Sequence, residues 1–223
     1  MNRKFVAIFR LVILWLSFLI FSQSRADVND YLCGSLQNSY GPYDYRSDMD
    51  KLRIVEQYHL TPEVVNLVKG TTGPIGADLD YTLRAFPNHH VALNAMIRLG
   101  EKQKTAKPIG AKYGVECYLQ RAMRFRNDDA VVRVLYASYL SKAGKRGESL
   151  NQLDEATRLG IDSANVNYNM GLIYFDLKEY DKSFSHAQRA YILGYPLPGL
   201  RDKLKKAGKW REPPAGTASG AIE

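Results

Sequence analysis

The sequence predicts an all-α protein: a right-handed solenoid of about three to four helical hairpins, with an irregular N-terminal arm and a C-terminal capping helix. The main observation is that the C-terminal half repeats itself without a gap at a spacing of about 34 residues, the length of two short antiparallel helices. Small residues fall on small ones and large apolar residues on large ones: Ala137, Ser149, Leu150, Ala156, Leu159 and Gly160 map onto Gly171, Ser183, Phe184, Ala190, Leu193 and Gly194. Because neither helix of such a hairpin can bury its apolar face alone, neighbouring hairpins must stack.

The clearest unit spans residues 164–197. Its first helix is expected to carry Tyr168, Gly171, Leu172, Tyr174 and Phe175, and its second Tyr180, Ser183, Phe184, Ala187 and Ala190. These residues resemble the tetratricopeptide repeat (TPR): Gly171 takes the place of the small residue at the helix crossing, and Tyr174, Ala190 and Pro196 approximate three further marker positions. Two departures are that Ser183 replaces the commoner alanine and that Pro196 lies one residue late. The resemblance implies stacked hairpins that hold other proteins.

The remaining units are less regular. Residues 130–163 repeat the pattern with Ala137 at the crossing and a glycine-rich turn over 143–147. Unit 88–129 is predicted to contain a helix over 90–102 and a second over 113–126. Their spacing is eight residues longer than in the next unit, and the insertion is expected around 104–110. A first unit over 61–87 would begin with a helix from Thr61 to Lys69. A lysine-rich capping helix is expected over 199–208, and residues 211–223 are expected to be disordered.

Residues 1–26 are predicted to be a signal peptide. Arg3, Lys4 and Arg10 precede or flank an apolar run, Leu11 to Phe21, and cleavage is expected after Ala26. The alternative is an uncleaved membrane anchor, although the run is about 11 residues long against the roughly 20 that a bilayer core requires. The prediction is a periplasmic or secreted protein, with membrane attachment only through an uncleaved signal.

Charge gives no argument for a nucleic-acid partner. Loss of the signal's four basic residues lowers the formal net charge from +8 to +4, which is ordinary for a soluble domain. The other basic residues are predicted to form solvated helix faces: Arg121, Arg124, Arg126, Lys203, Lys205 and Lys206.

Two cysteines follow the signal, Cys33 and Cys117, and an exported protein usually keeps such a pair bonded. The bond would close a loop of about 84 residues and pin the N-terminal segment onto the second helix of an early repeat. Such a loop corresponds to roughly 4 to 5 kcal/mol in the chain-entropy estimate. The alternative is two separate thiols.

Residues 27–60 fit no repeat and are predicted to form an irregular aromatic-rich arm, in which 48–59 is either a short helix or a packed irregular segment.

In the resembled family, partners bind in the concave groove along the first helices. The corresponding positions here are mainly apolar and predict a partner-binding groove without the basic residues of a carboxylate clamp: Met96, Leu99, Val134, Ser138, Tyr168, Leu172 and Phe175. Either a partner's apolar segment or the arm itself would occupy this groove.

No catalytic constellation, cofactor site or metal site is predicted. The adjacent pair His89-His90 begins a helix, and neighbouring helical side chains point about 100° apart, which does not suit chelation of one metal. Acid pairs near helix starts are accounted for by the helix dipole: Asp78 and Asp80 with Glu116, and Asp128 with Asp129.

The leading prediction is a non-catalytic exported protein that binds a protein or peptide in the cell envelope. The alternative is a structural subunit of an envelope polysaccharide or secretion system, whose aromatic arm contacts glycan.

Overall fold

The computed structural model describes residues 33–71, 73–160 and 162–211, and within these ranges the protein is entirely helical, with ten helices and no strands. The predicted signal peptide, the first residues of the arm and nearly all of the predicted tail lie outside the described residues. The chain divides into two compact units, residues 1–127 and 128–223, whereas the sequence predicts one repeat domain over 61–210. The boundary falls close to the predicted end of the 88–129 unit.

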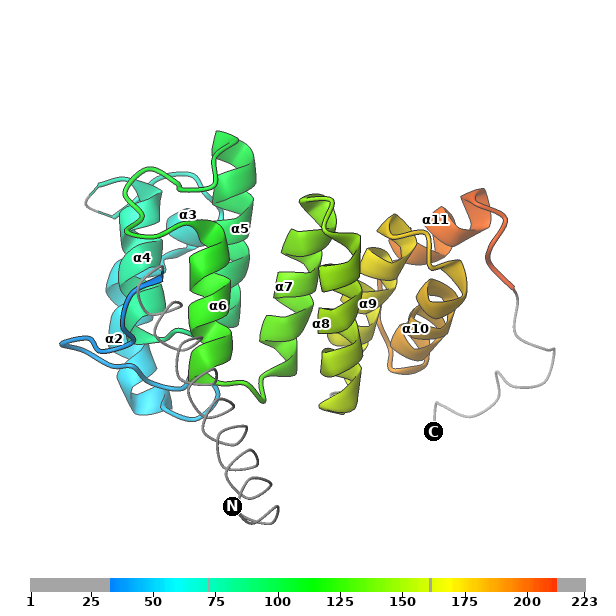
Figure 1. Ribbon diagram of the computed structural model, residues 1–223, viewed down its shortest axis with the longest axis horizontal. Helices are drawn as coiled ribbons and strands as arrows, with labels where there is room; N and C mark the ends of the chain where they lie inside the picture. Colours follow the sequence, from blue (N-terminus) through cyan, green and yellow to red (C-terminus); the bar gives the residue numbers. More distant parts are fainter. Residues whose placement is uncertain (1–32, 72, 161, 212–223) are drawn as a thin grey trace, which may run out of the picture. The chain divides into compact units, whose positions relative to one another are not determined.

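The second unit contains two successive hairpins and a short final helix (Figure 1). The hairpins are α7 (Ala130–Lys142) with α8 (Arg146–Arg158), and α9 (Ala164–Asp176) with α10 (Tyr180–Ile192); α11 (Gly199–Lys206) follows. All four helix boundaries of the first hairpin recur at the equivalent positions of the second, so that α9 matches α7 and α10 matches α8 end for end. The helices of the second unit therefore repeat with the same spacing as the sequence pattern.

Local signals at the ends of these helices also recur. Asp129 accepts hydrogen bonds from two backbone N–H groups at the start of α7, and Ser163 accepts one at the start of α9. The turn inside each hairpin has a residue in the left-handed region, Gly144 at φ 75° and Lys178 at φ 62°. The shared core of the two hairpins is formed by residues of α7, α8 and α9 and one that follows α9: Ala130, Val134, Ala137, Leu153, Ala156, Val166, Met170, Ile173, Tyr174 and Leu177.

The serine that departs from the resembled family has a structural role in both hairpins. Ser149 Oγ donates a 2.8 Å hydrogen bond to the Ala137 carbonyl, and Ser183 Oγ donates one of the same length to the Gly171 carbonyl. Both serines are fully buried. Each hydroxyl thus joins the two helices of its hairpin where they cross, at a position where alanine would only fill space.

Replacing Ser183 with alanine is expected to lower the free energy of unfolding of the second unit by about 1 kcal/mol, because one buried hydrogen bond is lost without a steric clash. Urea unfolding followed by Trp210 fluorescence would measure it. Ser185→Ala on the same helix is the matched control, since that hydroxyl is exposed and bonds within its own helix. Equal effects of the two substitutions would contradict the role assigned to Ser183.

The first unit contains α2 (Met49–His59), α3 (Pro62–Val65), α4 (Ile75–Ala85), α5 (His90–Gln103) and α6 (Val115–Phe125). The short helix within the arm is thus present. The helix predicted from Thr61 to Lys69 is wrong in length: it covers four residues, because Leu67 takes a left-handed conformation at φ 58° and the chain turns away. The predicted insertion lies in the connection between α5 and α6.

Candidate functional site

The apolar groove predicted from the sequence is not an open surface over most of its length. Met96, Leu99 and Val134 are 0%, 1% and 5% exposed. These three side chains belong to the packed interior of their units, where a partner does not reach them. An apolar residue gives the same sequence pattern whether it lines a groove or fills the core. The prediction therefore included these three buried residues.

The other predicted groove residues lie in the second unit, and α11 covers three of them. Tyr168, Leu172 and Phe175 are partly buried against Leu200 and Leu204 of α11, both of which are fully buried. Lys203 lies 5.4 Å from the centre of the Phe175 ring, a cation–π contact. Ser138 is partly exposed. The end of the predicted groove is therefore occupied by the chain's own final helix.

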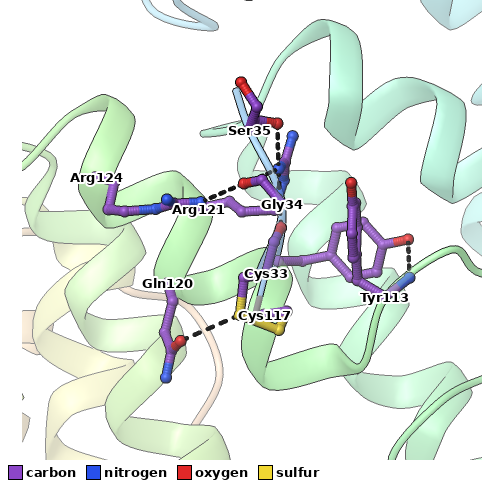
Figure 2. Close-up of a disulfide and its surroundings, with 9 residues drawn as sticks. Cys33, Gly34, Ser35, Tyr113, Cys117, Gln120, Arg121 and Arg124 are labelled. Atoms are coloured by element: carbon purple, nitrogen blue, oxygen red, sulfur yellow. Dashed lines mark hydrogen bonds between the residues drawn. A yellow bond between two sulfur atoms is a disulfide. The ribbon is translucent and has the colours of Figure 1, made fainter. Parts of the chain in front are cut away.

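The arm is fixed to the first unit by a disulfide bond. Cys33 and Cys117 are joined with an S–S distance of 2.07 Å and a Cα–Cα distance of 5.1 Å (Figure 2). Cys117 lies on α6, so the bond ties the start of the described arm to that helix. This is the pairing predicted from the sequence, and no free cysteine is left among the described residues.

Two arginines on α6 hold the same segment by its backbone, as Figure 2 shows. Arg121 donates to the carbonyl oxygens of Cys33, Gly34 and Ser35 at 3.0, 3.0 and 2.7 Å, and Arg124 donates to that of Gly34 at 2.8 Å. We refer to this arrangement as the arginine clamp. The Arg121 guanidinium also lies 4.9 Å from the centre of the Tyr113 ring. Burial lowers the pKa of Arg121, but an arginine remains charged at neutral pH.

The arginine clamp corrects a prediction. Arg121 was expected on a solvated helix face, yet it is 1% exposed. The sequence carries a signal that would have located it: Arg121 follows Cys117 by four residues, so both side chains lie on one face of the helix. A segment bonded to Cys117 must pass over Arg121.

Replacing Arg121 with methionine is expected to lower the free energy of unfolding of the first unit by about 2 kcal/mol, because three backbone carbonyls lose a charged donor. Chemical denaturation followed by near-ultraviolet circular dichroism of the tyrosines would measure it, with Trp210 fluorescence giving the transition of the second unit separately. Arg124→Met is the matched control and should cost less, since Arg124 contacts one of these carbonyls and Arg121 contacts all three. A larger loss for Arg124→Met would contradict the central role of Arg121.

A second polar cluster fixes the middle of the arm to the start of α5. The Asp44 carboxylate accepts hydrogen bonds from Asn88 at 2.7 Å and from Arg46, and it pairs with Arg126 at 3.1 Å. Burial opposes its ionisation, but the hydrogen bonds from Arg46 and Asn88 outweigh burial and hold the pKa of Asp44 well below its usual value. Asn88 in turn accepts from the backbone N–H of Tyr45.

The arm's tyrosines are packed against this unit. Tyr40, Tyr43 and Tyr45 lie partly buried against a cluster formed by α2 and the end of α4: Leu52, Val55, Ala85 and Phe86. Tyr45 also stacks on the His89 ring with centroids 4.1 Å apart. The rings of the arm are therefore engaged within the protein.

His89, which the sequence placed at a helix start, caps α5 and is fully buried. Its Nδ1 accepts from the Ala92 backbone N–H at 3.4 Å, and its Nε2 lies 3.2 Å from Glu56 Oε1. Since Nδ1 acts as an acceptor, the ring is neutral and its Nε2–H donates to Glu56. Burial, with a smaller contribution from His90, lowers the pKa of His89 to about 3.

The acids that could be grouped as catalytic pairs have structural partners. Asp78 accepts from the Thr71 backbone N–H at 2.8 Å and lies 3.0 Å from His59 Nδ1. Asp80 accepts from the Tyr118 hydroxyl at 2.5 Å and from Arg84 at 2.9 Å. Burial, together with the hydrogen bond to Asp80, raises the pKa of Tyr118. Asp129 caps α7, and within the described ranges no group of three metal-ligating side chains is found.

In the described part of the chain no helix is both long and apolar enough to span a bilayer. Compared with known proteins, the chain matches no family model and none of the curated proteins.

Proposed function

We propose that this chain is a non-catalytic protein-interaction module of the TPR type, in which stacked right-handed hairpins hold a protein or peptide partner in the cell envelope. The observation that carries the proposal is the recurrence in the second unit: every helix boundary, the left-handed turn and the buried serine bond of the first hairpin return in the second. Repeats of this kind stack hairpins to present extended surfaces for partners.

Export to an oxidising compartment is the second part of the proposal. The disulfide lies beside the arginine clamp, and its Cys33 is only 2% exposed. Disulfide bonds of this kind persist in secreted and periplasmic proteins. The apolar run and small residues of 1–26 are consistent with the same route.

The contact surface differs from the groove first predicted. At the end of α10 and just after it, the second unit exposes three large apolar side chains: Ile192 at 74%, Leu193 at 36% and Leu197 at 58%. Tyr195 in the same segment stacks on Tyr168 with centroids 3.8 Å apart. An exposed apolar segment of this kind is typical of a protein-binding surface.

The test is in-cell cross-linking of the full chain, followed by purification and mass spectrometry. The double variant Ile192→Ser with Leu197→Ser is expected to lose the partner that the wild type recovers, with unchanged helix content because both side chains are exposed. Val68→Ser is the control, since Val68 is 71% exposed and lies in the other unit. Recovery of the same partner by the double variant would refute this surface.

The alternative of a glycan-contacting arm has less support. Stacking on a sugar requires an accessible aromatic face, and the rings of Tyr43 and Tyr45 already contact Phe86 and His89.

A further inference from the structure

The second unit has a cavity of about 460 Å³ that the predicted groove does not include. It lies where the turn between α7 and α8 meets the turn between α9 and α10. Its lining consists of residues from these two turns and the helix ends beside them: Ser141, Lys142, Gly144, Arg146, Asp176, Leu177 and Lys178. Both turns are visible at one end of the unit in Figure 1.

The lining is dominated by positive charge. Lys142, Arg146 and Lys178 contribute cations, Ser141 contributes a hydroxyl, and Asp176 is the acid in the lining. Asp176 also lies 3.8 Å from Lys203, which offsets its charge. Arg146 pairs with Glu179 at 2.5 Å, which places a second acid beside the lining; this contact uses one of the five N–H donors of the guanidinium.

Lys178 occupies a position where the preceding repeat has glycine. Its φ of 62° is left-handed, and Gly144, the equivalent residue of the first hairpin, has a φ of 75°. Glycine adopts this conformation without steric cost, whereas for a residue with a side chain the cost is on the order of 1 kcal/mol. The second hairpin thus has a strained backbone at a residue that lines the cavity, where the first hairpin has glycine.

We propose that this cavity binds a side-chain carboxylate of an acidic peptide segment. The basic side chains of Arg146 and Lys178 attract the carboxylate, and the Ser141 hydroxyl is a further donor. Asp176 disfavours a doubly charged phosphate more than a singly charged carboxylate. This inference rests on the proposed function, since it names the chemistry of one part of the partner.

The test is a fluorescence-anisotropy titration of the full chain at low salt. The probe is a labelled heptapeptide of alternating glutamate and leucine with blocked ends. Lys178→Gly and Arg146→Gln are each expected to weaken binding about fivefold at low salt, the effect of losing one charged contact at an exposed site. Lys178→Gly restores the residue that the turn favours, so its folded state should be at least as stable as the wild type and a loss of binding cannot come from misfolding.

The matched control is Lys104→Gly. Lys104 is also left-handed, at φ 51°, and the substitution removes the same charge, but Lys104 does not line the cavity. Its affinity for the probe should stay within about twofold of the wild type. The proposal is overturned if Lys178→Gly and Arg146→Gln bind as the wild type does, or if the glutamine analogue of the probe binds equally well. It is also overturned if inorganic phosphate displaces the probe at lower concentration than acetate.

The two proposals fail in different ways. If the wild type recovers no partner by cross-linking while the probe still binds in a Lys178-dependent manner, the cavity assignment stands and the proposed function does not. If partner recovery is intact and the probe is insensitive to Lys178→Gly, only the cavity assignment fails.

Discussion

Replacing Cys33 and Cys117 with alanine should lower the free energy of unfolding of the first unit by about 2 to 5 kcal/mol. The bond joins positions with a sequence separation of 84, and the loop between them contains the rest of the arm and the helices α2 to α5, so its loss lets the unfolded chain gain entropy. The same loss releases the segment that the arginine clamp holds. This is the largest single effect we expect from a substitution.

Chemical denaturation with two probes would measure this effect. Near-ultraviolet circular dichroism of the tyrosines reports on both units, because eight tyrosines lie in the first and seven in the second. Trp210, packed edge-on against Phe184 and Tyr191, reports on the second unit, so the tyrosine transition of the first unit is the part of the signal that does not follow Trp210. Wild type unfolded in the presence of a strong reductant should match the double variant, and the double variant should not respond to reductant. An unchanged tyrosine transition in the double variant would contradict the assigned role of the disulfide.

Acidification should destabilise the first unit well above the pH at which carboxylates titrate. Folded His89 has a pKa of about 3 against 6.5 for an unperturbed histidine, so below pH 6.5 the unfolded chain binds a proton that the folded chain does not. Stability contributed by the neutral ring is complete above pH 6.5. It is lost by about 1.4 kcal/mol per pH unit as the pH falls towards 3.

Neighbouring groups set the range in which this slope can be measured. Burial raises the pKa of Glu56, so protonation of Glu56 stabilises the fold near its ordinary value of 4.5 and opposes the effect of His89. Asp44, whose pKa is depressed, adds to acid destabilisation only below about 3.8. His186 has a lowered pKa through burial but lies in the second unit. Measurements between pH 5 and 7 therefore isolate His89 when the transition reported by Trp210 for the second unit is subtracted from the tyrosine signal.

His89→Asn is the informative variant. Asparagine can cap α5 in the same way but does not titrate, so the slope of first-unit stability against pH between 5 and 7 should become nearly flat. The slope reported by Trp210 for the second unit should be unchanged. A slope for the tyrosine signal that is as steep in His89→Asn as in the wild type would rule out His89 as its source.

Prediction from sequence succeeded where structure depends on local signals. In the second unit the hydrophobic period, the capping residues Asp129 and Ser163 and the left-handed turns together fix the helices, and each signal acts within a few residues. The Cys33 to Cys117 pairing was also predictable, since two cysteines allow only one pairing within the chain.

Prediction from sequence was poorer where contacts between distant parts of the chain decide the conformation or burial of a residue. Nothing in the residues around Leu67 indicates a left-handed conformation, and the α3 helix stops there. The sequence around Arg121 predicts a surface residue, but contact with the arm buries it in the folded protein. Likewise, Met96 and Leu99 have the same apolar character whether they line a groove or fill a core, and burial alone distinguishes the two.

The buried contact between α9 and α11 has a consequence for the order of the repeats. A methyl group on Gly171 would lie 2.5 Å from Leu200 Cδ2 of the final helix, whereas the equivalent position of the preceding hairpin, Ala137, carries that methyl. The two hairpins have the same helix boundaries but are not equivalent at this position, because a methyl group on Gly171 would require the Leu200 side chain to move. Glycine at this crossing therefore lets Leu200 pack directly against the backbone of α9.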